Sequence, residues 1–322
     1  MPGVKRDWLL PTVATCALVA LPAVLTPYTQ DLVVKIAIYA IFALSLELLV
    51  GVTGLVSLGH AAFLGIGAYV TALAAGDSGG SIATVAPLAV LAAAGYALFV
   101  GALSLRTKGV YFIMVTLAFA QMAYFVFHDT KLAGGSDGLF LYAKPTLGAL
   151  NLDDKRQMYF VVIATLVATY ALLALLMRAR FGHALAGIRV NEQRMRAAGF
   201  ATFGYKLAAF VIAGALAGLA GFLLAVKDGA VNPELLSWHE SGAVLLMLIL
   251  GGIGSLRGAV IGAIAFTLLK ELFQLESLLG PLASHWQMTL GFTIIAFVAL
   301  LPKGLIGLGA RFSGTRAGAS HG

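Results

Sequence analysis

Two carboxylates, Glu47 and Glu271, lie inside long apolar segments of this sequence, where ionisable side chains are costly and usually functional. Carriers driven by protons or sodium ions place such groups deep in the bilayer to bind the coupling ion. Glu47 precedes the glycine-containing segment 51–54, and Glu271 directly follows Lys270. Each carboxylate can reach an interface or pair with a base, and Glu47 can alternatively line a transport pathway. Because such carboxylates are scarce here, the sequence argues against an ion-coupled carrier.

Other chemical patterns are absent from the sequence. It contains no G-x-x-x-x-G-K-[ST] segment, so the chain by itself does not hold nucleotide phosphates or hydrolyse ATP. Its six histidines form no H-E-x-x-H pattern and no cluster with metal-ligand spacing, and no G-x-S-x-G nucleophile elbow is present. We therefore predict no catalytic residue, no metal and no cofactor bound by this chain, which disfavours a membrane-embedded enzyme.

The composition is that of an integral membrane protein. Hydrophobic residues make up 60% of the chain and charged residues 11%, and the mean hydropathy is +0.95, values far from those of soluble globular proteins. A membrane-spanning helix needs about 20 predominantly apolar residues. We predict an all-α polytopic membrane protein with one transmembrane domain over residues 1–322 and about ten helices, some of them broken. The apolar runs cover residues 9–26, 32–50, 58–75, 84–104, 110–128, 157–177, 207–226, 241–254, 258–274 and 286–301.

Two of these runs lead into glycine-rich segments, residues 51–69 and 251–265. Glycine is tolerated in membrane helices where helices pack closely, or where a broken backbone lines a cavity. Both interpretations remain open from the sequence. The second makes the first segment part of a translocation path, as half-helix ends are in transporters. Its candidate residues are Glu47, Gly54, Ser57, Gly59 and His60.

The distribution of basic residues predicts the orientation, because short loops rich in Lys and Arg stay in the cytoplasm. With the first run entering from the cytoplasm, fourteen of the 21 Lys and Arg residues fall on the inner side. We therefore expect both termini to be cytoplasmic and the loops 129–156 and 227–240 to face outward. The net charge of +7 reports this topology and does not indicate nucleic-acid binding.

The segment 178–206 is the longest strongly basic stretch of the chain and is expected to be a folded cytoplasmic loop. Within it, Asn191 is a suitable N-cap, Glu192 suits a first helical turn and Gly199 a C-terminal stop, so a short helix is predicted over residues 191–198. Its arginines, Arg194 and Arg196, can meet a carboxylate-bearing partner. Alternatively, the loop contacts only anionic lipid headgroups, each base contributing about 1 kcal/mol.

The chain resembles the permease subunits of ATP-binding-cassette importers of the branched-chain amino acid (leucine/isoleucine/valine) type. The resemblance is most extensive over residues 186–225, AGIRVNEQRMRAAGFATFGYKLAAFVIAGALAGLAGFLLA, which is similar to the family's coupling loop and following helix. The matches cover nearly the whole chain in order, and the chain looks like the longer of the two permease subunits. Further matches are GLVSLGHAAF (54–63), KGVYF (108–112), GGSDGL (134–139), LGGIGS (250–255) and PKGL (302–305).

The resemblance implies a permease that moves branched-chain or other neutral amino acids across the bacterial plasma (inner) membrane into the cytoplasm. It implies four kinds of association: a second permease subunit, two cytoplasmic ATP-binding subunits, an extracytoplasmic solute-binding protein and membrane lipid. ATP and Mg would then be bound by the ATPase subunits. Two alternatives stay open: a related importer permease for urea or short amides, and a stand-alone secondary transporter or channel.

The resemblance also implies roles for two groups of residues. The loop would dock on an ATPase subunit through Arg189, Asn191, Glu192, Arg194, Arg196, Ala198 and Gly199. The outer loop would receive the binding protein at Gly134, Gly135, Ser136, Asp137 and Gly138. The chain departs from the family pattern at Arg196, where an acid is usual, and this predicts compensating acidic groups on the ATPase partner.

Overall fold

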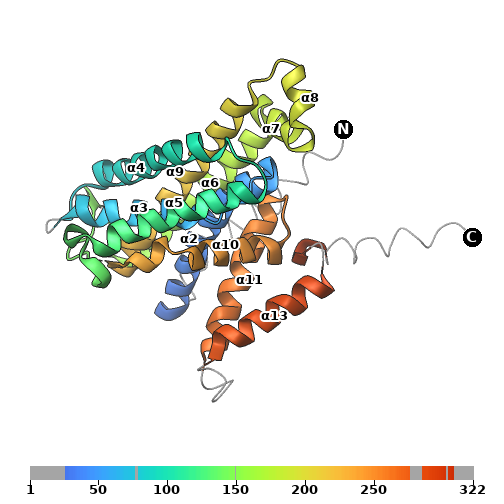
Figure 1. The fold of residues 1–322 in the computed structure, drawn as a ribbon. Coiled ribbons are helices and arrows are strands. Elements are labelled where there is room, and N and C mark those ends of the chain that lie inside the picture. The colour runs from blue at the N-terminus through green and yellow to red at the C-terminus, as the bar shows by residue number, and fades with distance from the viewer. Residues whose placement is uncertain (1–25, 77–78, 149, 276–284, 302–303, 308–322) are drawn as a thin grey trace, which may run out of the picture.

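The computed structural model describes residues 26–76, 79–148, 150–275, 285–301 and 304–307, and these form a bundle of helices (Figure 1). The helices are α2 (Pro27–Glu47), continued by the π-helical segment η2 (Leu48–Thr53), α3 (His60–Ala75), α4 (Ile82–Ser104), α5 (Val110–Asp129), α6 (Lys155–Arg178), α7 (Arg180–Val190), α8 (Glu192–Ala197), α9 (Thr202–Asp228), α10 (Trp238–Gly251), α11 (Leu256–Gln274) and α13 (Trp286–Leu300). Short elements are η3 (Lys131–Ala133), η4 (Gly135–Asp137), β1 (Leu139–Phe140), β2 (Thr146–Leu147), β3 (Leu150–Asn151), β4 (Ala230–Val231) and η5 (Pro233–Leu236).

The described helices fit the predicted class of all-α polytopic membrane protein. Among the described residues, six helices are long and apolar enough to cross a membrane, or seven if the bent pair α10 and α11 counts as one span. Nine of the ten predicted runs fall on helices, and the first run, 9–26, lies outside the described residues except for Thr26, as do the two chain termini. The described residues thus do not confirm ten crossings, because α3 and α10, with 16 and 14 residues, are by themselves shorter than a crossing requires.

Small residues let α3, α4 and α9 pack backbone to backbone. A Cβ atom built on Gly218 of α9 would lie 2.4 Å from the Cβ of Ala93 on α4, and one built on Gly221 would lie 2.0 Å from the carbonyl oxygen of Leu64 on α3. No larger side chain fits these positions without separating the helices. In this part of the chain, glycine and alanine serve close packing, as is usual between membrane helices.

The two glycine-rich segments identified in the sequence are the places where helices break. The π-helical segment η2 ends at Gly54, whose φ is 73°, and the chain is non-helical until α3 begins at His60. The second break separates α10 from α11, whose axes differ by 114°. Gly252 and Gly254 have φ angles of 112° and 98° there, a backbone conformation that favours glycine. Ser255 then caps α11 by accepting a hydrogen bond from the Gly258 amide at 3.1 Å.

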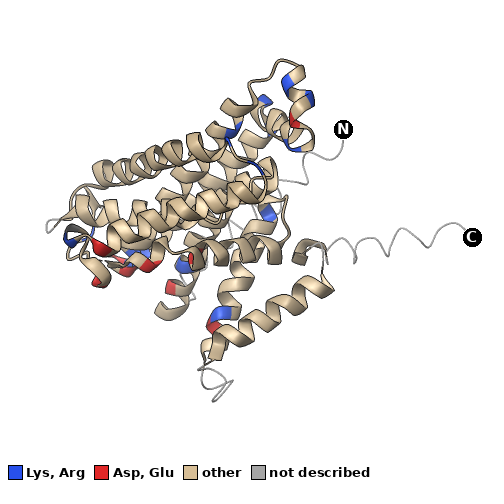
Figure 2. Ribbon diagram, viewed as in Figure 1, with Lys and Arg blue, Asp and Glu red and all other residues tan. Residues whose placement is uncertain are grey.

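The two ends of the bundle differ in structure and in charge. The helices α7 and α8 project from one end, while β1 and β4 lie at the other, called here the strand end (Figure 1). Figure 2 shows Asp and Glu gathered mainly at the strand end, Lys and Arg prominent on α7 and α8, and few charges between. Because β1 pairs antiparallel with β4, with Leu139 opposite Val231, the two predicted outer loops form one surface.

Candidate functional site

The basic segment 178–206 folds as two helices, of which the sequence analysis expected only the second. The first, α7, places Phe181, Leu185 and Ile188 on one face at helical spacing, and Leu185 and Ile188 are buried against the bundle. This i, i+4, i+7 pattern is the signal that predicts an amphipathic helix, and it was overlooked beside the basic residues. The pattern matters because burial of this apolar face fixes the direction of the opposite face of α7 and the position of its C-terminal residues.

The predicted short helix is confirmed as α8. The side chain of Asn191 accepts a hydrogen bond from the Arg194 amide at 2.9 Å, and Gly199 ends the segment with a φ of 88°. The side chain of Met195 packs against Gly187 of α7, where a built Cβ would lie 2.9 Å from the Met195 sulfur. Local capping therefore forms α8, and packing on α7 fixes its position.

Glu192 ties α8 to the start of α9. Its Oε1 atom accepts hydrogen bonds from Arg196 Nη2 at 2.8 Å, Lys206 Nζ at 3.0 Å and Thr202 Oγ1 at 3.2 Å. Partial burial opposes ionisation of Glu192, but the hydrogen bond and charge of Lys206 and the hydroxyl of Thr202 outweigh it and lower the pKa of this carboxyl. The Lys206 side chain is only 9% exposed, so its ammonium group depends on this carboxylate.

The predicted docking residues of this loop differ in their surroundings. Arg196 forms an ion pair with Glu192 inside α8, although 63% of its side chain stays exposed. Arg194 is exposed, and its guanidinium contacts no acid within the described residues. Ala198 and Gly199 are also exposed at the end of α8. Of the two arginines, Arg194 is therefore the one whose charge is available to a partner.

Arg189, at the end of α7, reaches the bundle. Its Nη1 atom donates a hydrogen bond to the carbonyl oxygen of Gly51 in η2. Its side chain also lies against Gly54, where a built Cβ would be 3.3 Å from Arg189 Cγ. Arg189 thereby connects α7 to the first helix break.

Glu47 connects the first break to the second. It is fully buried, and its Oε1 atom accepts a hydrogen bond from the Gly254 amide, at the bend between α10 and α11, at 2.7 Å. Its side chain lies over Gly51, where a built Cβ would be 1.9 Å from Glu47 Oε1. Its second oxygen, Oε2, has no hydrogen-bond partner among the described residues. The structure thus joins α7, η2 and the α10–α11 bend through Arg189, Gly51, Glu47 and Gly254.

The other candidate path residues are packed inside the bundle. His60 is fully buried, with Nε2 at 2.8 Å from Ser45 Oγ and its ring between those of Phe42 and Phe63, at centroid distances of 5.4 and 5.5 Å. Ser57 accepts a hydrogen bond from the Gly59 amide at 3.3 Å. A Cβ built on Gly59 would lie 2.2 Å from the carbonyl oxygen of Thr116 on α5.

Sequence reasoning missed Ser241, which has no distinguishing motif. This fully buried residue of α10 accepts a hydrogen bond from the Ala61 amide at 2.9 Å, and so satisfies a free N–H group in the first turn of α3. The contact holds the start of α3, after the first break, against α10, before the second.

The predicted docking loop at the strand end is tightly shaped. Gly134, Gly135 and Gly138 have φ angles of 75°, 63° and 78°. A Cβ built on Gly138 would lie 2.0 Å from the carbonyl oxygen of Val231, so the loop is pressed against the β4 strand. Between these glycines, Ser136 and Asp137 are exposed. They are therefore accessible for contact with another molecule.

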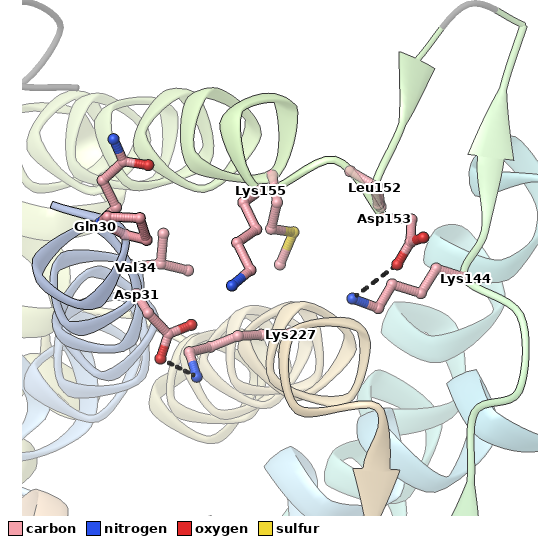
Figure 3. Close-up of a pocket in the computed structure, with 10 residues that line it drawn as sticks. Gln30, Asp31, Val34, Lys144, Leu152, Asp153, Lys155 and Lys227 are labelled. Atoms are coloured by element: carbon pink, nitrogen blue, oxygen red, sulfur yellow. Dashed lines mark ion pairs between the residues drawn. The ribbon is translucent and has the colours of Figure 1, made fainter. Parts of the chain in front are cut away.

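Ion pairs reinforce the same end of the bundle. Figure 3 shows Lys144 paired with Asp153 at 3.3 Å and Lys227 paired with Asp31 at 3.2 Å, the latter joining α9 to α2. Lys155, from the first turn of α6, points into the small pocket between these pairs. The pocket has a volume of about 60 Å³, which admits water but no amino acid. These groups therefore hold the loop at the strand end and the helix ends together.

The described residues contain no group of three His, Cys, Asp or Glu side chains that could hold a metal ion.

Comparison with known proteins agrees with the resemblance. The family model described as "Branched-chain amino acid transport system / permease component" matches residues 28–299. The chain is 30% identical to the high-affinity branched-chain amino acid transport system permease protein LivM of Escherichia coli (strain K12), over 89% of this chain and 72% of LivM. It is 25% identical to BraD, a permease protein of the same kind from Pseudomonas aeruginosa, over 74% of this chain and 83% of BraD.

A further relative is the E. coli permease protein LivH, which is 27% identical over 45% of this chain and 46% of LivH. No solved structure gives a significant match. The family match spans most of the chain, including both helix breaks and the α7–α8 segment. The chain therefore belongs to the family of permease components of branched-chain amino acid transport systems.

Proposed function

We propose that this chain is a permease subunit of an ATP-binding-cassette importer that moves branched-chain or other neutral amino acids into the cytoplasm. Relatives named for branched-chain amino acid transport, LivM and BraD, support the substrate class. The observation that carries the mechanism is the connection from α7 through Arg189 and Glu47 to both helix breaks. A stand-alone carrier would have no evident use for an exposed basic element linked in this way.

In this proposal the α7–α8 end faces the cytoplasm of a bacterial cell and the strand end faces outward. The charge distribution supports this orientation, because basic loops remain inside (Figure 2). The chain would cross the inner membrane about ten times, with both termini in the cytoplasm. Short helices such as α3 and α10 would then complete crossings together with the non-helical segments beside them.

The proposed partners follow from this orientation. Of the two cytoplasmic ATP-binding subunits, which bind ATP and Mg, one contacts α7 and α8, with the exposed Arg194 meeting an acidic group. A second permease subunit completes the membrane core, as LivH and LivM are both permease proteins of E. coli. A solute-binding protein docks on the loop containing Ser136 and Asp137 at the strand end.

The contacts suggest how ATP hydrolysis moves the membrane helices. Closure of the ATP-binding subunits displaces α8, and the Glu192–Lys206 ion pair carries this displacement into α9. The same movement shifts α7, and Arg189 transmits it to the Gly51 carbonyl in η2. Glu47 then moves the Gly254 bend, so both breaks respond together. A π-helical segment such as η2 is a suitable point of movement, because such segments are often found at functional sites.

The decisive experiment measures vanadate-sensitive ATP hydrolysis and leucine uptake by the tagged protein purified with its partner chains. Reversal of Arg194 to glutamate should release the ATP-binding subunits or abolish stimulated hydrolysis, since a like charge then faces the acidic partner. Arg180→Glu is the matched control, because Arg180 is exposed at the opposite end of α7. Isolation of the intact chain without ATPase subunits, with uptake when reconstituted alone, would instead identify a secondary carrier.

A further inference from the structure

A larger cavity, of about 610 Å³, lies between α2, α10, α11 and α13. This volume falls within the range of about 300–1,000 Å³ that is usual for small-molecule sites. Its lining includes Glu240 in the first turn of α10, Lys270 near the end of α11 and Trp286 at the start of α13. These helix ends lie away from α7 and α8 (Figure 1), so the cavity is on the side of the strand end.

The cavity brings opposite charges together without pairing them. Lys35 and Lys270 supply two ammonium groups, and both are within electrostatic range of the Glu240 carboxylate. Glu234 and His239 also line the cavity near Glu240, and Glu234 Oε1 accepts a hydrogen bond from the Tyr124 hydroxyl at 3.4 Å. Neither lysine nor Glu240 forms an ion pair within 4.0 Å with another described residue, although Lys270 Nζ lies 5.3 Å from the centroid of the Trp286 ring. Partly buried charges of opposite sign are costly to leave apart. A ligand that carries both a positive and a negative charge would pair with these side chains.

The remaining wall of the cavity is mostly apolar. Met247, Phe266 and Leu290 line it from three different helices and are themselves buried. Thr267 also lines it, and its hydroxyl is buried and has no hydrogen-bond partner among the described residues. Buried hydroxyls are nearly always hydrogen-bonded, so this one is an unused polar group at the wall of the cavity.

We infer that this cavity receives a zwitterionic amino acid with an aliphatic side chain. Glu240 binds the α-ammonium group, Lys35 and Lys270 bind the α-carboxylate, and Met247, Phe266 and Leu290 contact the side chain. A sugar needs no such pair of opposite charges, and an amine or an acid would leave one of them unmatched. The inference rests on the proposed function, because it assigns the import substrate to a specific site.

The test is substrate protection of a cysteine in the complete transporter, reconstituted with its solute-binding protein. The chain's only cysteine, Cys16, is first replaced by serine, and Ala243→Cys then places a thiol in the wall of the cavity. A membrane-impermeant thiol reagent is added from the outer side, with and without leucine. The matched control is Gln274→Cys, which is exposed at the end of α11 and does not line the cavity.

Leucine should slow labelling of Ala243→Cys at least fivefold and leave Gln274→Cys unchanged. The protection should be lost when Glu240→Gln or Lys270→Gln is added, since each removes one of the charges that the zwitterion needs. Equal protection of Gln274→Cys, or no protection in a complex that imports leucine, would overturn the inference while the proposed function stands. Failure of the unsubstituted complex to import any neutral amino acid would overturn the proposed function, and this inference with it.

Discussion

Arg189→Ala should leave ATP hydrolysis in place but uncouple it from transport. The substitution removes the hydrogen bond from the guanidinium to the Gly51 carbonyl, by which α7 holds the first helix break. It also removes a positive charge from the neighbourhood of the buried Glu47, which holds the second break. Since Arg189 is not among the buried residues of α7, the helix itself should remain folded on its apolar face.

The size of the effect follows from the bond that is lost. A hydrogen bond from a charged donor contributes about 1.5–3 kcal/mol, and the exposure of part of Arg189 favours the lower value. Because every 1.4 kcal/mol corresponds to a factor of ten, about a tenfold loss is expected in the equilibrium that links movement of α7 to movement of the breaks. Arg189→Lys keeps the charge but not the planar fork of donors, so an intermediate loss is expected.

The assay measures the number of leucine molecules imported per ATP hydrolysed in proteoliposomes that contain the complete complex. This ratio should fall about tenfold for Arg189→Ala, whereas Arg180→Ala, at the other end of α7, should match the unsubstituted protein. An unchanged ratio for Arg189→Ala in an assembled, hydrolytically active complex would refute the proposed connection. Loss of assembly would show instead that Arg189 stabilises the docking surface.

Three further predictions concern the α8–α9 contact and the packing of α11 on α10. Glu192→Ala should destabilise the α8–α9 contact by about 2 kcal/mol, because Lys206 is left buried without its carboxylate; protease cleavage within 191–201 should rise accordingly. The fold lowers the pKa of Glu192, so the stabilisation by its ionised carboxylate is fully present above the ordinary pKa of 4.5 and is lost as the pH falls through the lowered pKa. The same protease cleavage should therefore increase in acid. Glu192→Gln should remove this pH dependence. Gly262→Ala should lower the free energy of unfolding by about 1–3 kcal/mol and so lower the melting temperature of the complex, since the added Cβ would lie 1.9 Å from the Met247 carbonyl oxygen. Gly291→Ala, where the added Cβ meets open space, should have no such effect.

Local patterns in the sequence were sufficient for the membrane class and the position of most helices, and they identified the two segments in which the breaks lie. Apolar runs locate helices because each segment must satisfy its own backbone hydrogen bonds in lipid. Asn191 and Gly199 located the ends of α8 because helix capping depends on residues a few positions apart. Residues 51–69 and 251–265 contained both breaks because a helix interrupted in a membrane protein commonly uses glycine. The family resemblance also followed from the amino-acid sequence alone.

The number of unbroken spans depended on tertiary structure. Apolar runs do not show where a helix stops within them, so the sequence alone did not show that α3 and α10 have only 16 and 14 residues. The amphipathic helix α7 was overlooked because its pattern is short and lies among basic residues. Its burial against the bundle, at Leu185 and Ile188, is what makes the pattern meaningful.

Which polar groups meet was decided only by the folded chain. Glu47 and Gly254 are separated by 207 positions, and Arg189 and Gly51 by 138, so no local rule connects them. The sequence indicated that Arg196 meets a carboxylate on a partner protein, yet in the structure it forms an ion pair with Glu192. The sequence determined where helices form and which residues can ionise, because those properties depend on neighbours along the chain. Partners for buried charges were determined by packing, because burial leaves each charge only the groups that adjacent helices bring within reach.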